Sequence, residues 1–578
     1  MNRRAFSYTM IKRAHLVLQC GVGSVLRTRQ GLTAVVAGLP EWQYCLGVNE
    51  GNEAKASQYI KEHSFREAEL TAATGLERFV APPAYSDSKK NWEIPVIRFP
   101  LAASCSNWKC RRLTYADHGT AFSRSWSCPH CGKNGKGRLQ QVPIFLACAQ
   151  GHLDELDWSD LIDHDEGCHG IDIQLNFRTA GAGANAKCLS CGKKATSRKI
   201  PCTGARPWLP GCSPERCDLE MEVVSRTSVK VYYPSTKSAI HIPVDAELNG
   251  ALVEWMRVTN WAAGRAVANE AERAVVGSAL REVGWDVDDE AAAAHVSHVL
   301  QPADSSDEEW AILSAREREF DILSGRRTYP ALSASSLISL EMTDLKRYQH
   351  PLVGPNRAII GITAVHKLTE SRTVNGFSRI QPRIVPQREG RLMMWGTGEP
   401  SESWLPGDRS HGEGIFIQLN ATYFDSVGCE TDSTGRELFV PSQAGVTAHT
   451  LAHLLINQLA ETSGYSAPSI RDRVYDLANG SVGVLVYTAD GDSMGTLGGL
   501  VAFAQPGEFE PLLDRAVRGA TWCAQDPVCE ESTLDHRRNI HAACHQCVLL
   551  PETSCELFNG HLDRRTVQML VSRSSTGG

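Results

Sequence analysis

The sequence has no apolar run that approaches the roughly 20 residues needed for a membrane-spanning helix. It also contains no fixed-period repeat and no low-complexity tract. Near its start, Gln19, Gly21 and Gly23 interrupt the apolar segment, and no small-residue cleavage site follows. This pattern differs from a secretory signal peptide, so we expect a mature protein located in the cytoplasm.

Motifs for nucleotide and nuclease chemistry are also missing. No G-x-x-x-x-G-K-[ST] sequence is present, so the chain lacks a P-loop and is not expected to hydrolyse ATP itself. No G-x-G-x-x-G stands between an expected strand and an expected helix, and no paired-carboxylate nuclease motif is evident. These absences favour a protein that is not an enzyme.

The chain has no overall excess of positive charge. Its formal net charge is −7, so any contact with nucleic acid must come from a local basic patch or a basic partner. The charge is unevenly distributed, because residues 151–170 carry seven acids and no Lys or Arg. Residues 187–206 contain no acid and hold a basic group of Lys187, Lys193, Lys194, Arg198, Lys199 and Arg206.

With 578 residues, the chain is too long for one hydrophobic core, and domains of roughly 100–200 residues predict three or four. We predict a multi-domain α+β protein with zinc modules in its N-terminal half and a mixed α/β C-terminal domain closed by a cysteine cluster. The predicted segments are a β-rich domain (1–100), zinc-binding modules (101–220), a mainly helical linker domain (221–349) and the C-terminal domain (350–578). Helical periodicity is clearest at 252–276, 306–325 and 446–461.

The chain contains nineteen cysteines, most of them between residues 105 and 217 or after residue 520. Disulfide scaffolds are short and secreted, whereas clustered CxxC pairs in a long intracellular chain indicate metal sites. A first set consists of Cys105, Cys110, Cys128 and Cys131, and two such pairs supply the four ligands of a tetrahedral zinc ion. Basic residues around this set, including Arg111 and Arg112, suit either a nucleic-acid strand beside Trp108 and Trp126 or a solvated surface.

A second predicted set pairs Cys148 and His152 with His164 and Cys168, on either side of the acidic stretch. A Cys and a His four residues apart can share one helical face. This spacing is less diagnostic than CxxC, so a buried cysteine with an exposed histidine is the alternative interpretation. His169 is a competing ligand.

A third set begins with the CxxC-Gly knuckle of Cys188 and Cys191 and continues with Cys202. Its fourth ligand is ambiguous between Cys212, which we select, and Cys217.

The closing cysteine cluster offers five candidates for four places. Cys544, Cys547 and Cys555 are the preferred ligands, with Cys529 placed ahead of Cys523 as the fourth. A redox role for the CxxC pair is the rival interpretation. Redox CxxC motifs usually lie in a βαβ context and need no further cysteines, so we favour zinc here.

Two other patterns suggest chemistry. His449, His453, Asn457 and Glu461 recur every four residues along the helix predicted at 446–461, and a His pair of this spacing can bind metal. Position 450 is Thr instead of the zincin Glu, so a polar ridge making interdomain hydrogen bonds is the preferred interpretation. The sequence "GDSMG" (491–495) matches G-x-S-x-G, but a Gly-rich turn follows it instead of a helix, which disfavours Ser493 as a nucleophile.

Several longer motifs occur in a fixed order. They are "HGEGIFIQL", "AHTLAHLLI", "SGYSAPSIRDRVY", "GTLGGLVAF", "DPVC", "CHQCVLLPETSCELFN" and "LDRR" in the C-terminal half, and "LQCGVGSVLRTRQGLTAVVAGLPEW", "CAQGHLDELDW", "TGARPWL" and "ESRTVNGFSRI" before them. The C-terminal motifs resemble a domain appended to some superfamily-two helicases. Taken together, the chain resembles the DrmB family, the accessory subunits of DISARM anti-phage systems.

This resemblance implies a partner, a separate helicase-like ATPase of the DrmA type, and a role in restricting phage DNA together with a methyltransferase. We therefore predict a non-catalytic subunit with three or four structural Zn²⁺ ions that assists DNA binding or sensing and does not contact membranes. The predicted DNA contacts are Arg111, Arg112, Lys193, Lys194, Arg198 and Lys199, with Trp208 as a further aromatic. The alternative is a metal- or serine-dependent hydrolase or nuclease, and a thiol redox protein is a third possibility.

Overall fold

The computed structural model describes residues 6–9, 11–28, 31–42, 59–60, 62–82, 94–116, 127–131, 137–176, 185–241, 274, 277–278, 289, 315–326, 338–383, 385–396, 404–424, 442–488, 499–535, 539–551 and 553–576. The helix predicted at 252–276 falls almost entirely outside these residues, as do the first part of the helix at 306–325, Trp126 and the "GDSMG" sequence. Helix accounts for 26% of the structure and strand for 32%, which confirms the predicted α+β class.

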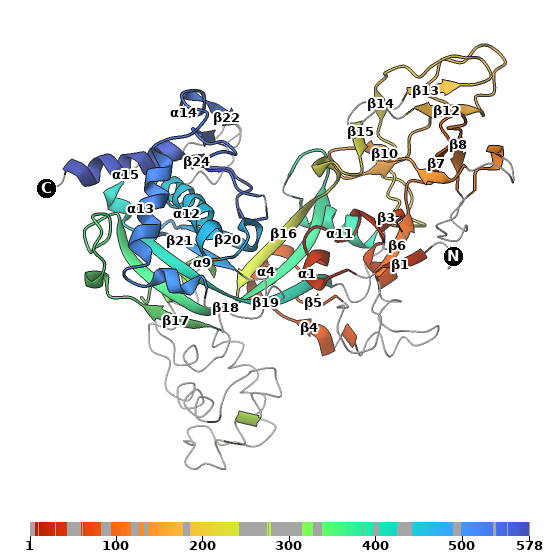
Figure 1. Cartoon of the computed structure of the whole chain (residues 1–578). Coiled ribbons are helices and arrows are strands. Elements are labelled where there is room, and N and C mark those ends of the chain that lie inside the picture. Colours follow the sequence, from red (N-terminus) through yellow and green to blue (C-terminus); the bar gives the residue numbers. More distant parts are fainter. Residues whose placement is uncertain are drawn as a thin grey trace. The chain divides into compact units, whose positions relative to one another are not determined.

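The chain forms two compact units (Figure 1). Unit 1 comprises residues 1–239 and 371–409, and unit 2 comprises residues 240–370 and 410–578. The strands β16 (Tyr233–Ile240), β18 (Ile359–Ser378) and β19 (Leu405–Leu419) contribute residues to both units.

Unit 1 is built mainly of short antiparallel strands. Its helices are α1 (Arg13–Leu16), α2 (Leu39–Trp42), α4 (Ala68–Thr74) and α11 (Gln387–Trp395), with 3₁₀ turns η2 (Pro129–Cys131) and η3 (Val229–Val231). Its strands are β1 (Phe6–Thr9), β2 (Val25–Arg27), β3 (Thr33–Val36), β4 (Ser64–Phe65), β5 (Phe79–Val80), β6 (Ile94–Arg98), β7 (Ala102–Cys105), β8 (Leu113–Tyr115), β9 (Leu139–Gln141), β10 (Ile144–Ala147), β11 (Leu153–Asp154), β12 (Ile173–Asn176), β13 (Asn185–Cys188), β14 (Ile200–Pro201) and β15 (Glu220–Ser225).

These strands form small separate sheets. The order β1-β6-β3-β2 makes an antiparallel sheet whose apolar residues enter the main core of unit 1. Residues 102–225 hold three further sheets, with orders β8-β7-β9, β11-β10-β15-β14 and β12-β13. We call residues 102–225 the cysteine-rich segment, because its sheets are short and its loops carry the clustered cysteines.

Unit 2 contains the longer elements. Its helices are α9 (Ala315–Leu323), α12 (Gln443–Thr462), α13 (Phe509–Ala520), α14 (Val528–Glu531) and α15 (Arg564–Thr576), with 3₁₀ turns η4 (Leu345–Arg347), η5 (Ala421–Tyr423), η6 (Ala467–Ser469) and η7 (Val501–Ala504). Its further strands are β17 (Ser339–Met342), β20 (Ile470–Asp476), β21 (Val482–Thr488), β22 (Thr533–Asp535), β23 (Ile540–His541) and β24 (Leu562–Asp563). The segment 443–488 therefore contains the predicted amphipathic helix and the strand after it.

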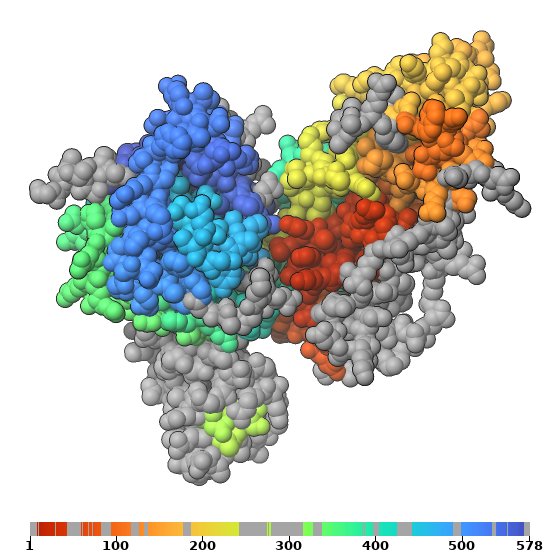
Figure 2. Space-filling model, in the orientation of Figure 1, coloured from red at the N-terminus to blue at the C-terminus, as the bar shows by residue number. Residues whose placement is uncertain are grey.

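The sheet of unit 2 runs in the order β18-β19-β21-β20 and is covered on both faces (Figure 1). Successive side chains of a strand point to opposite faces. Val484 and Val486 accordingly join the core beneath α12, whereas Leu485 and Tyr487 join the core that includes Phe320 of α9. In the space-filling view the blue C-terminal residues lie beside the cyan surface of unit 2 (Figure 2), and α12 packs against both α13 and α15.

Helix α12 is buried along most of its length. Its N-cap is Ser442, whose hydroxyl accepts a hydrogen bond from the Gly445 amide (3.0 Å). Asp476 at the end of β20 in turn accepts from the Ser442 amide (2.6 Å). These hydrogen bonds tie the start of α12 to the end of β20.

Candidate metal centres

Sixteen of the described Cys and His residues gather into four clusters of four. Centre I contains Cys105, Cys110, Cys128 and Cys131; centre II contains Cys148, His152, Cys202 and Cys217; centre III contains His164, Cys168, Cys188 and Cys191; centre IV contains Cys523, Cys529, Cys544 and Cys547. Within each centre the potential ligand atoms lie within 4.8 Å of one another.

The sulfur spacing fits a tetrahedral metal site. Sulfur–sulfur contacts run from 3.5 Å (Cys523–Cys544) to 3.8 Å (Cys110–Cys128). With Zn–S bonds of about 2.3 Å, the sulfurs of a tetrahedral site lie about 3.8 Å apart, whereas a disulfide holds them at about 2.05 Å. The described cysteines are all free, and the donor sets Cys₄ and Cys₃His are those of structural zinc.

Centre I is assembled from Cys105 at the end of β7, Cys110 in the loop after it, and Cys128 and Cys131 at the turn η2. The backbone amide of Asn107 donates to Cys105 Sγ (3.4 Å), as expected for a knuckle that stabilises a thiolate. Gly137 closes over the centre, because a Cβ at this position would lie 2.6 Å from Cys105 Sγ and 2.7 Å from Cys131 Sγ. Only glycine therefore fits there without displacing two ligands.

Centre II lies between the β10–β11 turn and the segment that leads from β14 to β15. His152 Nδ1 is 3.4 Å from Cys148 Sγ and 3.5 Å from Cys202 Sγ. Its other nitrogen, Nε2, faces Glu215 Oε2 at 3.3 Å, and Glu215 also pairs with Arg206 at 2.7 Å. Metal-binding histidines usually donate their second N–H to such a carboxylate, so the arrangement holds Nδ1 toward the sulfurs.

Centre III combines His164 and Cys168, which precede β12, with Cys188 at the end of β13 and Cys191 in the turn after it. His164 Nδ1 lies 3.4 Å from Cys191 Sγ and 3.5 Å from Cys168 Sγ, while Nε2 faces the Ser159 hydroxyl at 3.2 Å. A hydrogen bond from the Lys193 amide lowers the pKa of the Cys191 thiol to about 6, which favours the thiolate that binds metal.

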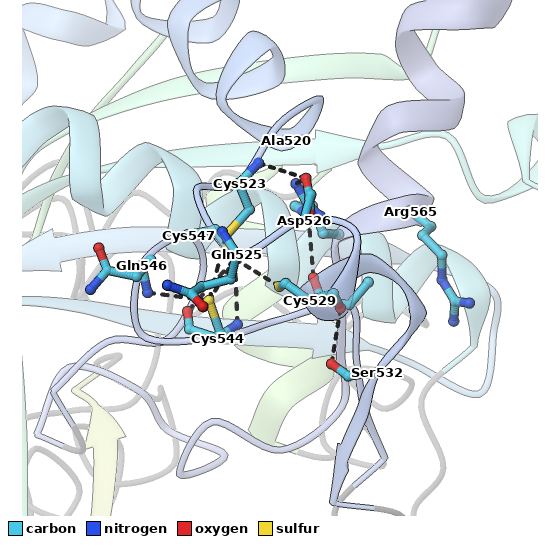
Figure 3. A network of polar contacts seen from close by, with 12 residues as sticks. Ala520, Cys523, Gln525, Asp526, Cys529, Ser532, Cys544, Gln546, Cys547 and Arg565 are labelled. Carbon is cyan, nitrogen blue, oxygen red and sulfur yellow. Dashed lines mark hydrogen bonds and ion pairs between the residues drawn. The ribbon is translucent and has the colours of Figure 1, made fainter.

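Centre IV joins the loop after α13 to the C-terminal CxxC knuckle (Figure 3). The amides of Gln525 and Gln546 donate to Cys523 and Cys544 at 3.5 and 3.4 Å. Asp526 accepts from the Cys523 amide (2.7 Å). It also receives two N–H groups of buried Arg564, at 2.6 and 3.1 Å, which links the centre to α15.

The grouping differs from the predicted one in three places. Cys148 and His152 do not share a cluster with His164 and Cys168: the structure puts the first pair with Cys202 and Cys217 and the second with Cys188 and Cys191. The reason is the antiparallel pairing of β10 and β15, which carries residues near 202–217 back to the β10–β11 turn.

Cys212, the predicted fourth ligand of the third set, is not among the clustered residues. Cys217 is clustered instead, together with Cys202 in centre II. The Cys202 amide bonds to Leu219 O (2.8 Å), so the segment that pairs with Cys202 brings Cys217 toward it. Cys212 instead lies against Gly396, at the apolar core of unit 1. In centre IV, Cys523 stands where Cys555 was predicted, and Cys555 lies next to His449 (Nε2–Sγ 3.1 Å).

The predicted polar ridge of α12 faces the C-terminal segment within unit 2. His449 Nδ1 contacts His561 O at 3.2 Å, His453 Nδ1 contacts Val548 O at 2.9 Å, and Asn457 donates to Cys547 O at 3.3 Å. Asp472 of β20, which no sequence pattern singles out, lies 3.0 Å from His449 and 3.1 Å from His453. His449, His453, Asp472 and Cys555 form a fifth, wholly buried group, which we call the histidine cluster.

The predicted DNA-contacting residues are exposed or half-buried, but most are paired with acids of the same segment. Arg112 pairs with Asp172 (3.2 Å), Lys193 with Asp165 (3.3 Å), Arg198 with Asp163 (3.1 Å) and Lys199 with Glu220 (2.8 Å). Arg111 donates to Asn176, and Lys194 is exposed.

Two predicted aromatic contacts differ in exposure. Trp108 is 71% exposed and has Lys109 over its ring. Trp208 is buried and donates to Met393 O (2.7 Å), so it serves the core of unit 1 and was wrongly placed on a DNA surface.

Comparison with known proteins agrees with these clusters. Residues 12–233 match a family described as a domain of unknown function (DUF8724), and residues 451–548 match the MrfA Zn-binding domain. The chain is 27% identical over 528 residues to the DISARM protein DrmB of Bacillus paralicheniformis, which covers 82% of this chain and 89% of the relative. The resemblance predicted from the motifs is confirmed.

The zinc-binding match includes Cys523, Cys529, Cys544 and Cys547, the ligands of centre IV. Zinc binding therefore has support from both donor geometry and sequence similarity. In the described part of the chain, no helix is both long and apolar enough to cross a membrane.

Proposed function

We propose that this chain is a non-catalytic, zinc-binding subunit of an anti-phage DNA-restriction complex. It binds a helicase-like ATPase of the DrmA type and assists the complex in holding or sensing DNA. The observation that carries this proposal is the similarity to DISARM protein DrmB over most of both chains. The motif order in the sequence supports the same conclusion.

The metal centres support a structural role. Catalytic zinc sites keep one position open for water or substrate, whereas structural sites have four protein ligands. Centres I to IV each present four Cys or His donors. In such a shell the ion stabilises the fold and has no position for a reactant.

The partner is tested by purifying the tagged full-length chain from its native host and identifying bound proteins by mass spectrometry. We expect a helicase-like ATPase in stoichiometric amount. A chain that purifies alone and cuts DNA or an ester would contradict the proposal. Loss of that activity in His453→Ala or Ser493→Ala would then assign the chain to the hydrolase or nuclease class.

The DNA role is tested with a quadruple charge reversal, Lys193→Glu, Lys194→Glu, Arg198→Glu and Lys199→Glu, in the complete complex. We expect weaker DNA binding and a shallower salt dependence, by about 0.7–0.9 in log–log slope for each phosphate that the variant no longer neutralises. Reversal of the exposed pair Lys346 and Arg347 in unit 2 is the control. Equal DNA binding by wild type and the quadruple variant, at unchanged zinc content, would contradict this surface.

A further inference from the structure

The histidine cluster brings together four potential metal ligands from three separate segments. His449 and His453 are one turn apart on α12, Asp472 is in β20, and Cys555 follows the CxxC knuckle. All four side chains are at least 96% buried, and their ligand atoms lie within 4.8 Å of one another. No residue of centres I to IV belongs to it.

The protons of the two histidines can be assigned from their contacts. Each Nδ1 faces a backbone carbonyl, His561 O at 3.2 Å for His449 and Val548 O at 2.9 Å for His453. A carbonyl only accepts hydrogen bonds, so each Nδ1 must carry the proton. A neutral imidazole then has its lone pair on Nε2, which is the arrangement found in metal-bound histidines.

Both Nε2 lone pairs point at atoms that can bind a metal ion. His449 Nε2 is 3.0 Å and His453 Nε2 is 3.1 Å from the same oxygen, Asp472 Oδ2. His449 Nε2 is also 3.1 Å from Cys555 Sγ. With protons alone these contacts need a further donor, which is a cationic ring, a protonated Asp472 carboxyl or the Cys555 S–H, in a buried group whose two ring centroids are 4.5 Å apart. A single divalent cation among the four atoms satisfies every contact.

The remaining polar atoms of the ligands are already occupied. Asp472 Oδ1 accepts from the Glu556 amide (2.7 Å), which leaves Oδ2 as the carboxylate oxygen that faces the cluster. Cys555 Sγ accepts from the Asn559 amide (3.1 Å). Such outer hydrogen bonds orient the ligands of a metal site.

We propose that His449, His453, Asp472 and Cys555 form a fifth zinc site. Two imidazoles, one carboxylate oxygen and one thiolate make a borderline donor set that suits Zn²⁺. With four protein ligands in a buried position, the site is closed. It fastens α12 and β20 to the C-terminal segment, and it is connected to centre IV because Val548, which accepts from His453, directly follows the ligand Cys547.

The test is the zinc content of the purified full-length chain, measured by plasma mass spectrometry. We expect five ions per chain, and four in Asp472→Asn and in Cys555→Ser. Cys523→Ser in centre IV should also lose one ion. Cys212→Ser is the matched control and should retain five, since Cys212 lies outside the clusters.

A second measurement uses the unaltered chain, in case a variant does not fold. After exchange of zinc for ¹¹³Cd, sites with three or four sulfurs give strongly downfield resonances, and a site with one sulfur gives a resonance well upfield of them. We expect one such upfield signal. Its absence, or an unchanged zinc count in both Asp472→Asn and Cys555→Ser, would overturn the fifth site. Neither result bears on the proposed defence role, which the partner experiment tests separately.

Discussion

The cysteine-rich segment and unit 2 use the same donors in different surroundings. In the segment, the small hydrophobic clusters include the ligands themselves, with Cys148 and Cys188 in one and Cys105 and Cys128 in the other. In unit 2, a large aliphatic core is formed by α12, α13, α15 and the sheet. Metal ligands are thus part of the small apolar clusters in the first region, whereas metal is added beside a large core in the second.

Removal of the metal should have the largest effect of these tests, and the effect should differ between the two regions. A structural zinc site contributes about 10–16 kcal/mol of binding free energy, and a buried Leu or Val side chain only about 1.5–3 kcal/mol. We therefore expect a strong chelator to unfold residues 102–225 and to leave α12, β20 and β21 folded. Hydrogen exchange followed by peptide mass spectrometry measures both regions in one sample. Equal loss of protection in both would show that unit 2 also depends on metal for its fold.

Within the cysteine-rich segment, single cysteine substitutions test which residues bind the ion of centre II. Cys217→Ala should remove the ion of centre II and expose the β10–β11 turn to protease, because three ligands leave the tetrahedral shell incomplete. Cys212→Ala should keep the full zinc content. The measurement is zinc per chain together with limited proteolysis. Loss of an ion from Cys212→Ala and not from Cys217→Ala would restore the grouping expected from the sequence.

That grouping shows what the sequence could and could not predict. The ligands of centre I were predicted as one set because a loose pair and a CxxC pair follow each other directly. Cys523 and Cys529 form the same kind of loose pair before the CxxC of centre IV, a signal that would have excluded Cys555. Centres II and III are nested along the sequence. Centre II takes its ligands from 148–152 and 202–217, and centre III takes its ligands from 164–168 and 188–191, which lie between them. Only the strand pairing, which depends on the whole fold, determines this.

As with the metal ligands, the parts of the fold that have a strong local sequence pattern were predictable and the others were not. The helix predicted at 446–461 has a strong local pattern, and the structure contains α12 there. The ridge of α12 was visible as a four-residue period, but its partner Asp472 was not. Asp472 lies in a strand, "IRDRVYD", in which Arg471, Asp472 and Arg473 are buried against groups distant in sequence. No local pattern distinguishes such a strand from an exposed one.

The next largest effect should come from a buried ion pair of unit 2. Glu319 of α9 accepts from Arg473 at 2.5 and 2.6 Å and from the Tyr475 hydroxyl at 2.8 Å. Burial, the largest single influence, opposes the ionisation of Glu319, but the charges of Arg473 and Arg316 and the hydrogen bonds from Arg473 and Tyr475 together lower its pKa. Glu319→Gln leaves the buried Arg473 charge with only Glu556, 3.7 Å away, as a counterion, which should cost up to about 3–5 kcal/mol of unfolding free energy.

Denaturant unfolding of the metal-loaded chain measures this cost. Glu341→Gln is the matched control, because Glu341 pairs with His366 in an exposed position, where a pair contributes about 0–1 kcal/mol. The transition assigned to unit 2 should shift in Glu319→Gln, and that of the cysteine-rich segment should not. A shift in the segment instead would remove the distinction between the two regions.

The smallest predicted effect concerns two carboxylates, one beside centre II and one beside centre IV, that each pair with a buried arginine. Glu215 pairs with buried Arg206 and faces His152 of centre II, and Asp526 pairs with buried Arg564 and accepts from the amide of a centre IV ligand. Glu215→Gln and Asp526→Asn should each weaken zinc binding at the adjacent centre by about 10–100-fold, the usual effect of removing such an outer partner. Competition with a chelator of known affinity measures both.

The consequences for folding should nevertheless differ between these two variants. At limiting zinc, Glu215→Gln should lower the unfolding temperature of the cysteine-rich segment, since there the ion stabilises a region with little core of its own. Asp526→Asn should leave the unfolding temperature of unit 2 nearly unchanged, because the aliphatic core around α12 persists without the ion of centre IV. If Asp526→Asn lowers the unfolding temperature as much as Glu215→Gln does, then zinc supports both regions alike, and the size of the apolar core does not decide how far a region depends on its metal.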